Sequence, residues 1–297
     1  MSQPKWTTRD GRALSELHPC FAIGRKSARG RIHLPVSPAC NLACRFCSRV
    51  LNDWENRPGV TSRVITPAEA VDTVRRAREV SPDLRVVGIA GPGDALATPH
   101  ALETFRLVKE AFPDSVLCMS TNGLMLPDRI KELIDVGLDT LTVTVNEVDP
   151  ERLAGLCAGI VYKGRALSGA EAGVILIRNQ LSGIRQAADA GIIVKANTVL
   201  APRLNGQRIA EIARAVSSAG AKLYNIIPLI PRHELAGEAL PTCAEIDAAR
   251  VVASEYIEVF RHCQHCRADA IGVPGGHDIS AELGLRRVVE QETFSHG

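Results

Sequence analysis

The chain has 297 residues, of which 45% are hydrophobic and 23% are charged, and its formal net charge is +2 at pH 7. This composition supports a buried core and excludes a disordered chain. No long block of lysines or arginines indicates a nucleic-acid partner, and no apolar run is long enough to span a bilayer. The first 17 residues contain no apolar segment typical of a secretion signal. We therefore expect a cytoplasmic protein without nucleic-acid or membrane partners.

Short β-rich runs alternate with amphipathic stretches from about residue 31 onward. Six of these runs are apolar on both faces, which is typical of parallel strands covered by helices. Each run ends in a polar or glycine-rich motif. The expected strands cover residues 31–37, 84–91, 116–123, 140–146, 192–200 and 222–230.

Proline marks the starts of the helices expected between these strands. Thr66-Pro67 and Thr98-Pro99 each precede an amphipathic stretch, and Pro127 begins a third, which Gly137 ends. Proline is favoured in the first turn of a helix, and glycine is favoured just after its end. Further helices are expected at about 170–190, 207–218 and 243–260, and Lys163-Gly164 is expected in a loop or insertion that interrupts the alternation.

Six successive β/α units predict an α/β protein whose parallel sheet curls into a partial (β/α)6 barrel. Functional residues in such a fold lie at the carboxyl ends of the strands. Because the motifs follow the strands, they are predicted to meet at one edge of the sheet. We expect N- and C-terminal extensions to close the mouth of the barrel. The predicted boundaries are an extension over 1–30 with Cys20, the barrel over 31–232, and an extension over 233–297 with Cys263 and Cys266.

Three cysteines, Cys40, Cys44 and Cys47, lie within eight residues just after the first expected strand. Nine cysteines in a reducing compartment favour metal or redox chemistry over disulfides. Three thiolates in one loop can hold an iron-sulfur cluster and leave one position open for a substrate or cofactor. A zinc site with a distant fourth ligand and three unpaired core cysteines are the alternatives.

The spacing Cys40-x-x-x-Cys44-x-Phe46-Cys47 resembles the motif of the radical S-adenosylmethionine superfamily. The resemblance implies a full or partial β/α barrel and a 4Fe-4S cluster held by the three cysteines. It further implies that S-adenosylmethionine binds the fourth iron and is cleaved reductively to a 5′-deoxyadenosyl radical. Phe46 is expected to lie beside the adenine.

Later strand ends supply the other expected contacts to S-adenosylmethionine. The family's second motif is a glycine-rich strand end that receives the methionine amino group, and GPGD at 91–94 stands in that place. A tight turn would explain these glycines equally well, and helix capping would explain the polar residues of the later strand ends. The expected contacts are Gly91, Gly93, Asp94, Ser120, Thr121, Asn122 and Asn146.

A longer series of motifs narrows the resemblance. HPC at 18–20, RIHLPVSPACN, ENRPGVTS, GIAGPGDAL, LCMSTNGLMLPD, TLTVTVNEVDP, KANTVL, NIIPLIP and CQHCRADA occur in this order between about residues 18 and 275. The series resembles the NifB family of nitrogenase cofactor maturases. We expect no counterpart of the small C-terminal domain that some members carry.

The resemblance to NifB implies a reaction, cofactors and partners. Two 4Fe-4S units would be fused into an eight-iron precursor, with a carbide taken from the methyl group of S-adenosylmethionine. Glu55 matches a family carboxylate that moves protons during this reaction, although a surface acid next to Arg57 is the alternative. Expected partners are iron-sulfur cluster donors, cofactor-accepting carriers, and a reductant such as ferredoxin or flavodoxin. One or two auxiliary 4Fe-4S clusters would be held by Cys20, Cys118, Cys263 and Cys266.

The residues themselves support part of this assignment. Cys263-x-x-Cys266 is a good chelating pair, and Cys118 lies on an expected strand that could aim it inward. Taken alone, Cys118 would more simply be a buried apolar thiol. Cys157 and Cys243, in expected helical contexts, are assigned to packing.

Two departures from the family pattern leave the substrate open. The Ala-His-His element expected after Cys20 is replaced by GRKSARGR, and the cysteine expected after the radical motif is replaced by Asn52 or Asp53. Asp53, His18 or His33 could complete a site, although a carboxylate is a harder ligand than iron-sulfur centres favour. A paralogue with one auxiliary cluster and another substrate is therefore a second hypothesis. A cluster scaffold without turnover is a third.

Overall fold

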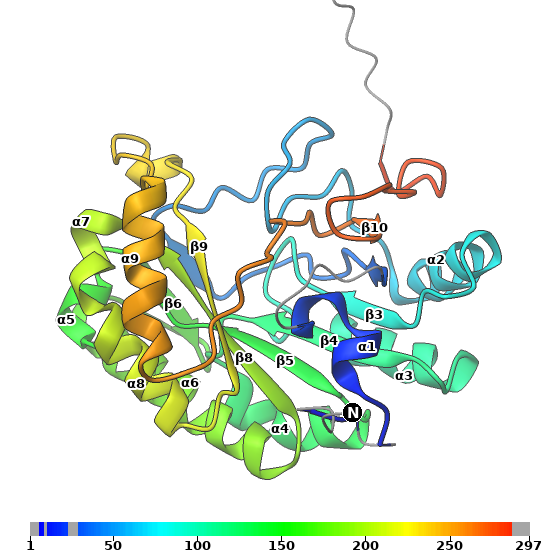
Figure 1. Cartoon of the computed structure of the whole chain (residues 1–297), viewed down its shortest axis with the longest axis horizontal. Coiled ribbons are helices and arrows are strands. Elements are labelled where there is room, and N and C mark those ends of the chain that lie inside the picture. The colour runs from blue at the N-terminus through cyan, green and yellow to red at the C-terminus, as the bar shows by residue number, and fades with distance from the viewer. Residues whose placement is uncertain (1–5, 9–10, 23–28, 287–297) are drawn as a thin grey trace, which may run out of the picture.

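A seven-stranded sheet organises the computed structural model, which describes residues 6–8, 11–22 and 29–286 (Figure 1). Its order is β10-β1-β3-β4-β5-β8-β9, and the six strands from β1 to β9 are mutually parallel. The six expected strands and the α/β partial barrel are thus confirmed. The strands are β1 (Arg31–His33), β3 (Val86–Ile89), β4 (Val116–Thr121), β5 (Thr140–Thr144), β8 (Ile193–Leu200), β9 (Leu223–Pro228) and the antiparallel β10 (Ile271–Gly272).

Helices connect the parallel strands, and three of them begin at or next to the prolines expected from the sequence to start them. At α2 (Pro67–Val80), Thr66 and Glu69 form a capping box, with Glu69 N donating to Thr66 Oγ1 at 3.2 Å. No helix among the described residues is long and apolar enough to cross a membrane. The other helices are α1 (Leu14–Leu17), α3 (His100–Ala111), α4 (Leu126–Asp135), α5 (Pro150–Leu153), α6 (Gly169–Asp189), α7 (Pro202–Asn205), α8 (Ile209–Ser218) and α9 (Cys243–Ser254), with 3-10 turns η1 (Pro19–Phe21), η2 (Gly206–Arg208) and η3 (His233–Leu235).

Helix α9 is shorter than the sequence predicts. It ends at Ser254 rather than near residue 260. The next residues instead run beside β9, where Tyr224 N donates to Glu258 O and Phe260 N donates to Tyr224 O, both at 2.8 Å. The backbone hydrogen bonds of this stretch are therefore made to a strand, and the helix cannot continue.

A small second sheet joins the cysteine loop to the segment between β5 and β8. It consists of β2 (Leu42–Cys44), β6 (Cys157–Tyr162) and β7 (Arg165–Leu167), in the order β2-β6-β7. The interruption expected at Lys163-Gly164 is the tip of the β6–β7 hairpin, where both residues have positive φ. Cys157 therefore begins a strand, and its expected helical context is wrong.

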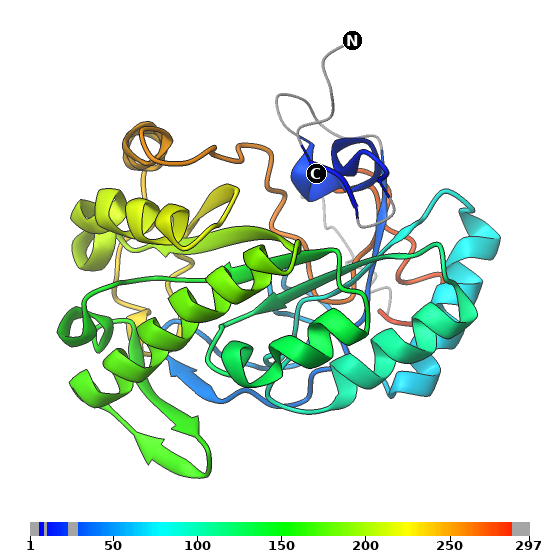
Figure 2. The ribbon, with the colours of Figure 1, turned by 90° about the horizontal axis from the view of Figure 1, so that it is seen from below.

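The two faces of the main sheet differ in chemistry. Helices cover the outer face, where alternate strand residues such as Val87, Leu117 and Val194 join the main apolar core (Figure 2). On the concave side, α1 and η1 pack against the first residues of several strands, and the segment after α9 runs over the same side. The strand residues between the apolar ones are mostly polar and lie in register across the concave face: Cys118 with Thr140, Thr142 with Lys195, and Asn197 with Asn225.

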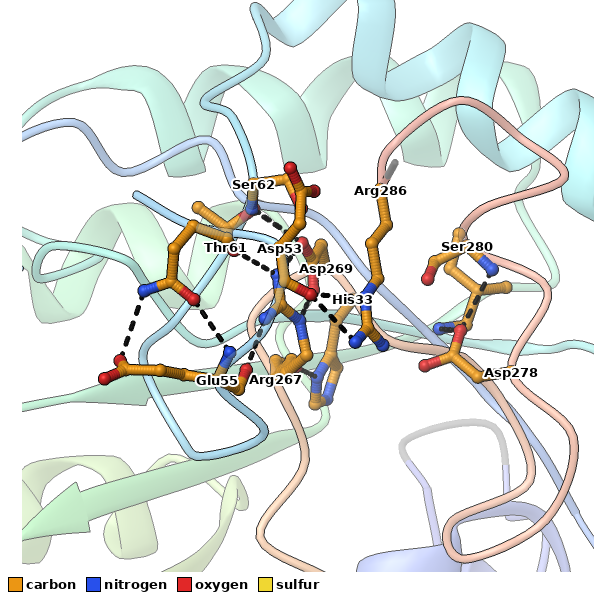
Figure 3. A network of polar contacts seen from close by, with 12 residues as sticks. His33, Asp53, Glu55, Thr61, Ser62, Arg267, Asp269, Asp278, Ser280 and Arg286 are labelled. Carbon is orange, nitrogen blue, oxygen red and sulfur yellow. Dashed lines mark hydrogen bonds and ion pairs between the residues drawn. The ribbon is translucent and has the colours of Figure 1, made fainter. Parts of the chain in front are cut away.

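A buried ion pair fastens the C-terminal segment to the chain after the cysteine loop (Figure 3). Arg267 is 1% exposed and Asp269 is 0% exposed, and Arg267 Nε lies 2.8 Å from Asp269 Oδ1. Arg267 also donates to the carbonyl oxygens of Asn52 and Glu55, while Asp269 accepts a hydrogen bond from Thr61 Oγ1. The removal of either charge would leave the other one buried and unpaired.

We expect Asp269→Asn to lower the free energy of unfolding by about 3 kcal/mol, because Arg267 would keep its charge without a counter-ion. Chemical denaturation followed by circular dichroism measures the loss. Asp247→Asn is the matched control, since the Asp247 side chain is 65% exposed in its ion pair with Arg250 and such pairs contribute less than about 1 kcal/mol. Equal losses in the two variants would contradict the prediction.

Candidate active site

The cysteine loop and the carboxyl ends of the parallel strands enclose one cavity. The three cysteines of the loop line it together with residues from the ends of β3, β4, β5, β8 and β9. Residues far apart in the sequence thus meet at the edge where the strand motifs predicted a site. Of the expected contacts to S-adenosylmethionine, the lining contains Phe46, Gly93, Asp94, Ser120, Thr121, Asn122 and Asn146.

The end of β3 packs directly on the backbone of the cysteine loop. Gly93 N donates to Ser37 O at 2.8 Å, and Asp94 N donates to Ala39 O at 2.9 Å. A Cβ atom at position 93 would lie 2.0 Å from Ala39 O, so only glycine allows this approach. The glycine-rich motif therefore fixes the position of the loop that carries Cys40.

Asp94 ties the ends of β3 and β4 together. Its carboxylate accepts hydrogen bonds from Thr121 Oγ1 at 3.0 Å and from the backbone N–H groups of Asn122 and Leu96 at 2.6 and 2.9 Å. Burial raises the pKa of Asp94, and these hydrogen bonds oppose the rise. Because its oxygens are occupied by protein donors, Asp94 shapes the cavity wall in this structure.

Asn122 connects this wall to the first cysteine. Its Nδ2 lies 3.8 Å from Cys40 Sγ and donates to Asn41 Oδ1 at 2.7 Å. The Asn122 carbonyl accepts a hydrogen bond from Gln180 Nε2 at 2.8 Å, so helix α6 also holds this corner. Hydrogen bonds to sulfur of this kind influence the reduction potential of a cluster.

Two other expected contacts have structural partners. Asn146 Oδ1 accepts from Val199 N at 2.9 Å, which links the ends of β5 and β8. Gly91 is not among the residues that line the cavity. A Cβ atom there would lie 3.2 Å from Gly59 Cα and 3.3 Å from Ala268 Cβ, so Gly91 packs against the Arg-Pro-Gly turn and the C-terminal segment. Its contact to a cofactor stays a prediction.

The donor set of the cavity fits a cluster with S-adenosylmethionine. Three thiols from one loop face it, and thiolates are the usual ligands of iron-sulfur clusters. In its wall, the buried Asn197 Oδ1 has no hydrogen-bond partner, which suits a ligand that carries N–H or O–H groups. Among the residues described here, no group of three His, Cys, Asp or Glu side chains is drawn together tightly enough to hold a single metal ion.

Several lining residues were not predicted from the sequence as contacts, among them Asn197, Gln180 and Cys157. Asn197 lies within the KANTVL motif at the end of β8, so the strand-end rule could have found it. Gln180 comes from the middle of α6, and Cys157 comes from the hairpin. Neither position carries a sequence signal, because both depend on how distant segments pack.

Glu55 lies between two arginines beside the site. Its carboxylate forms ion pairs with Arg57 and Arg232 and accepts a hydrogen bond from Asn52 Nδ2. Burial raises the pKa of Glu55, but Asn52 and the two guanidinium groups outweigh it and hold the pKa below its ordinary value. The carboxylate side chain is 12% exposed, so Glu55 is an ionised, largely buried group rather than a surface acid.

The four cysteines expected to hold auxiliary clusters lie near one another inside the barrel. Cys20 interacts electrostatically with both Cys118 and Cys266, and Cys266 interacts with Cys263. Burial raises the pKa of Cys118 to about 11 and raises that of Cys266, although Arg31 opposes the latter. The structure thus gathers a second group of thiols, and the ligand role of these thiols stays a prediction.

His33 and His18 lie close to this second group, and their ring nitrogens have different partners. His33 Nδ1 lies 2.9 Å from Arg267 O, so it donates there and leaves Nε2 as an acceptor. Burial lowers the pKa of His33 to about 3, which keeps the ring neutral. His18 Nδ1 instead accepts from Cys20 N at 3.1 Å, which places its proton on Nε2. Gly88 leaves room for the His33 ring, since a Cβ there would lie 3.0 Å from His33 Cδ2.

The two departures from the family pattern have different outcomes. Of Asn52 and Asp53, which stand where a cysteine was expected, Asn52 is 5% exposed and uses its side chain to bind Glu55. The Asn52 side chain therefore stabilises the turn of residues 52–55. Asp53 accepts hydrogen bonds from Arg286 through its carbonyl oxygen (Figure 3). The replacement of Ala-His-His by GRKSARGR falls largely on residues 24–28, which lie outside the described residues.

A loop with three cysteines that lines a cavity at the carboxyl edge of a partial parallel barrel is the arrangement of a radical S-adenosylmethionine enzyme. The family model "Radical SAM superfamily" matches residues 34–216. Methylornithine synthase (PylB) has the same fold, with a TM-score of 0.51 over 78% of this chain and 65% of that one, at 16% sequence identity.

Curated relatives place the chain more narrowly. It is 39% identical to the FeMo cofactor biosynthesis protein NifB of Methanocaldococcus jannaschii, over 95% of this chain and 96% of that protein. This chain is 44% identical to NifB of Klebsiella pneumoniae over 87% of its own length. The match spans only 57% of the length of that relative. The chain belongs to the NifB family of radical S-adenosylmethionine proteins.

We expect Gly93→Ala to lower the free energy of unfolding by about 1–3 kcal/mol, because the added methyl group would overlap Ala39 O. The displaced loop should also retain less iron at Cys40, Cys44 and Cys47. Chemical denaturation and iron analysis of the reconstituted protein measure the two effects. Gly237→Ala is the control, since a Cβ there meets nothing within 4 Å. If Gly93→Ala behaves like this control, the proposed packing is wrong.

Proposed function

We propose that this chain is a radical S-adenosylmethionine enzyme of FeMo cofactor biosynthesis. In the proposed reaction it fuses two 4Fe-4S units into an eight-iron precursor and inserts a carbide from the methyl group of S-adenosylmethionine. The observation that carries the proposal is the similarity to NifB of Methanocaldococcus jannaschii along 95% of the chain. The second group of cysteines within the same barrel supports it.

The first group of thiols would hold the resident cofactors. Cys40, Cys44 and Cys47 would bind a 4Fe-4S cluster, and S-adenosylmethionine would occupy the rest of the cavity. When bound, this pair supplies a 5′-deoxyadenosyl radical. Phe46 would lie beside the adenine, and Asn197 Oδ1 would accept a hydrogen bond from the cofactor. Asp94 and Asn122 would keep the cysteine loop in place.

The second group of thiols would hold the substrate clusters within the barrel of residues 31–232. Cys118 comes from that barrel, Cys20 comes from the N-terminal extension 1–30, and Cys263 and Cys266 come from the C-terminal extension 233–297. His33 Nε2 would add a nitrogen ligand. The Nδ1 proton donates a hydrogen bond to Arg267 O, so the lone pair on Nε2 is available.

Glu55 would move protons as a cluster sulfide is methylated. The ion pairs with Arg57 and Arg232 keep its carboxylate free of a proton at neutral pH, and hence able to accept one. Partners of this reaction would be iron-sulfur cluster donors, a cofactor-accepting carrier, and a reductant such as ferredoxin or flavodoxin. All of these would meet the protein in the cytoplasm.

One observation favours a second candidate function. Asn52, one of the two residues that stand in the place of an expected thiol ligand, is hydrogen-bonded to Glu55, and neither Asn52 nor Asp53 is a thiol. With four auxiliary cysteines, the barrel could hold a single auxiliary cluster completely. The chain would then be a paralogue with the same radical chemistry and another substrate, or a scaffold that carries clusters without turnover.

Anaerobic reconstitution separates these functions. The proposed reaction requires about twelve irons per chain, since three 4Fe-4S units are present. It also requires that S-adenosylhomocysteine and 5′-deoxyadenosine are both released. Eight irons without methyl transfer would overturn the proposal in favour of the paralogue. Full loading without cleavage of S-adenosylmethionine would favour the scaffold.

Two variants test how the cysteines are divided. Cys47→Ala should abolish cleavage of S-adenosylmethionine, because the radical cluster would lose a ligand. Cys266→Ala should lose an auxiliary cluster while uncoupled cleavage continues. Iron analysis and chromatography of 5′-deoxyadenosine measure both results. If cleavage is lost equally in the two variants, the division into two groups is wrong.

A further inference from the structure

Two buried cations lie on the concave face of the barrel without a carboxylate to balance them. Lys195 on β8 is 6% exposed, and Arg31 on β1 is 3% exposed. No Asp or Glu among the residues that the structure describes forms an ion pair with either of them. Arg31 donates instead to Gly272 O at 2.6 Å, and its Nε is buried without a partner. Because a buried charge requires an opposite charge nearby, these cations indicate that an anion binds beside them.

The Lys195 ammonium lies among aromatic rings that pack with the second group of thiols. Its Nζ is 5.2 Å from the centre of the Phe21 ring and 5.4 Å from that of the Phe260 ring. Ring faces attract a cation but do not neutralise its charge. Both rings belong to one apolar cluster, and the cysteines that pack against this cluster are Cys20, Cys118 and Cys263.

The strand order of the sheet places the two cations on either side of Cys118. Arg31 lies on β1 and Lys195 lies on β8, and β4, which carries Cys118, is the middle one of the strands between them. Arg31 is in register with Val86, and Val86 is in register with Val116. Both valines belong to the same apolar cluster as the two rings. The barrel therefore presents one cation at each flank of the second group.

A third buried donor lies next to Cys20. His18 Nδ1 accepts a hydrogen bond from Cys20 N, so the proton of the neutral ring is on Nε2. This Nε2 is buried and has no hydrogen-bond partner among the described residues. Buried N–H groups are almost always paired, so an occupant that offers acceptors suits this place. The sulfur atoms of an iron-sulfur unit are such acceptors, whereas a bare metal ion offers none.

Both cations favour the form of the thiols that binds iron. Burial raises the pKa of Cys118 to about 11, and the charge of Lys195 opposes this rise. Burial also raises the pKa of Cys266, and Arg31 opposes that rise. Iron binds the thiolate, and a cluster core held by cysteine thiolates carries a net negative charge. The charges of Arg31 and Lys195 are therefore complementary to such a unit.

We propose that Arg31 and Lys195 compensate the negative charge of an iron-sulfur unit that binds to the second group of thiols. The two cations hold this anion in the interior of the barrel, where an unbalanced charge is unfavourable. They also stabilise its reduced form, which is the more negative one, and so raise its reduction potential. The inference rests on the clusters that the proposed function assigns to the second group. It does not depend on the radical cluster.

Redox titration of the reconstituted full-length chain tests this role. All variants are made in a chain with Cys40→Ala, Cys44→Ala and Cys47→Ala, so that the remaining iron belongs to the second group. Lys195→Met removes the charge but keeps a long unbranched side chain. It should lower the midpoint potential measured by electron paramagnetic resonance and release iron to a chelator faster. Lys195→Arg keeps the charge and should stay close to the parent chain. Lys222→Met is the matched control, because Lys222 is exposed and directly precedes β9.

The stability of the iron-free chain separates charge compensation from packing. Without the cluster, Lys195→Met should be at least as stable as the parent chain, because it removes a buried ammonium that has no counter-ion. Chemical denaturation followed by circular dichroism measures this. A packing role would instead make the iron-free Lys195→Met chain less stable, and that result would overturn the inference.

Two further outcomes distinguish the possible failures. If the second group binds iron but Lys195→Met leaves both the midpoint potential and the rate of iron release unchanged, the inference is wrong and the proposed function stands. If the parent chain is folded by circular dichroism but retains no iron, the clusters assigned to the second group under the proposed function fail, and the inference fails with them.

Discussion

The buried ion pair of Arg267 and Asp269 is the contact on which both thiol groups depend. Arg267 directly follows Cys266, and its guanidinium donates hydrogen bonds to the backbone carbonyls of Asn52 and Glu55. Its own carbonyl oxygen accepts a hydrogen bond from His33 Nδ1 (Figure 3). A single residue thus joins the C-terminal cysteines, the turn after the radical motif, and the first strand. Because a buried charge requires its partner, this junction has essentially one arrangement. The ion pair therefore ties the segment of Cys263 and Cys266 to the turn that follows the cysteine loop.

The register of the parallel sheet explains how one barrel brings two groups of thiols to the same face. Side chains alternate between the faces of a strand, so every second residue of β4 points to the concave side. Cys118 and Ser120 are two such residues, and they lie at successive levels along the strand. Ser120 reaches the cavity of the cysteine loop, whereas Cys118 lies deeper, beside Cys20. The fold therefore places Ser120, in the cavity of the cysteine loop, and Cys118, in the second group of thiols, on the same face of the sheet.

The six strands, the helix starts and the cysteine loop could be predicted from the sequence because each depends on local signals. The hydrophobic periodicity, the proline positions and the cysteine spacing can each be recognised within a short segment of the sequence. The end of α9 could not be predicted, since residues 257–260 pair with β9. The cavity role of Cys157 was missed for the same reason, because it arises from the pairing of β2 with a hairpin far along the chain. Cys243 is exposed, so its assignment to packing is wrong.

The central claim is that two separate groups of cysteines bind iron within one barrel. Crystals of the anaerobically reconstituted protein, measured above and below the iron absorption edge, test it most directly. The account predicts one group of anomalous peaks at Cys40, Cys44 and Cys47, and a second group inside the barrel at Cys20, Cys118, Cys263 and Cys266. Iron at the first position alone, or a second group of peaks held by other residues, would contradict it.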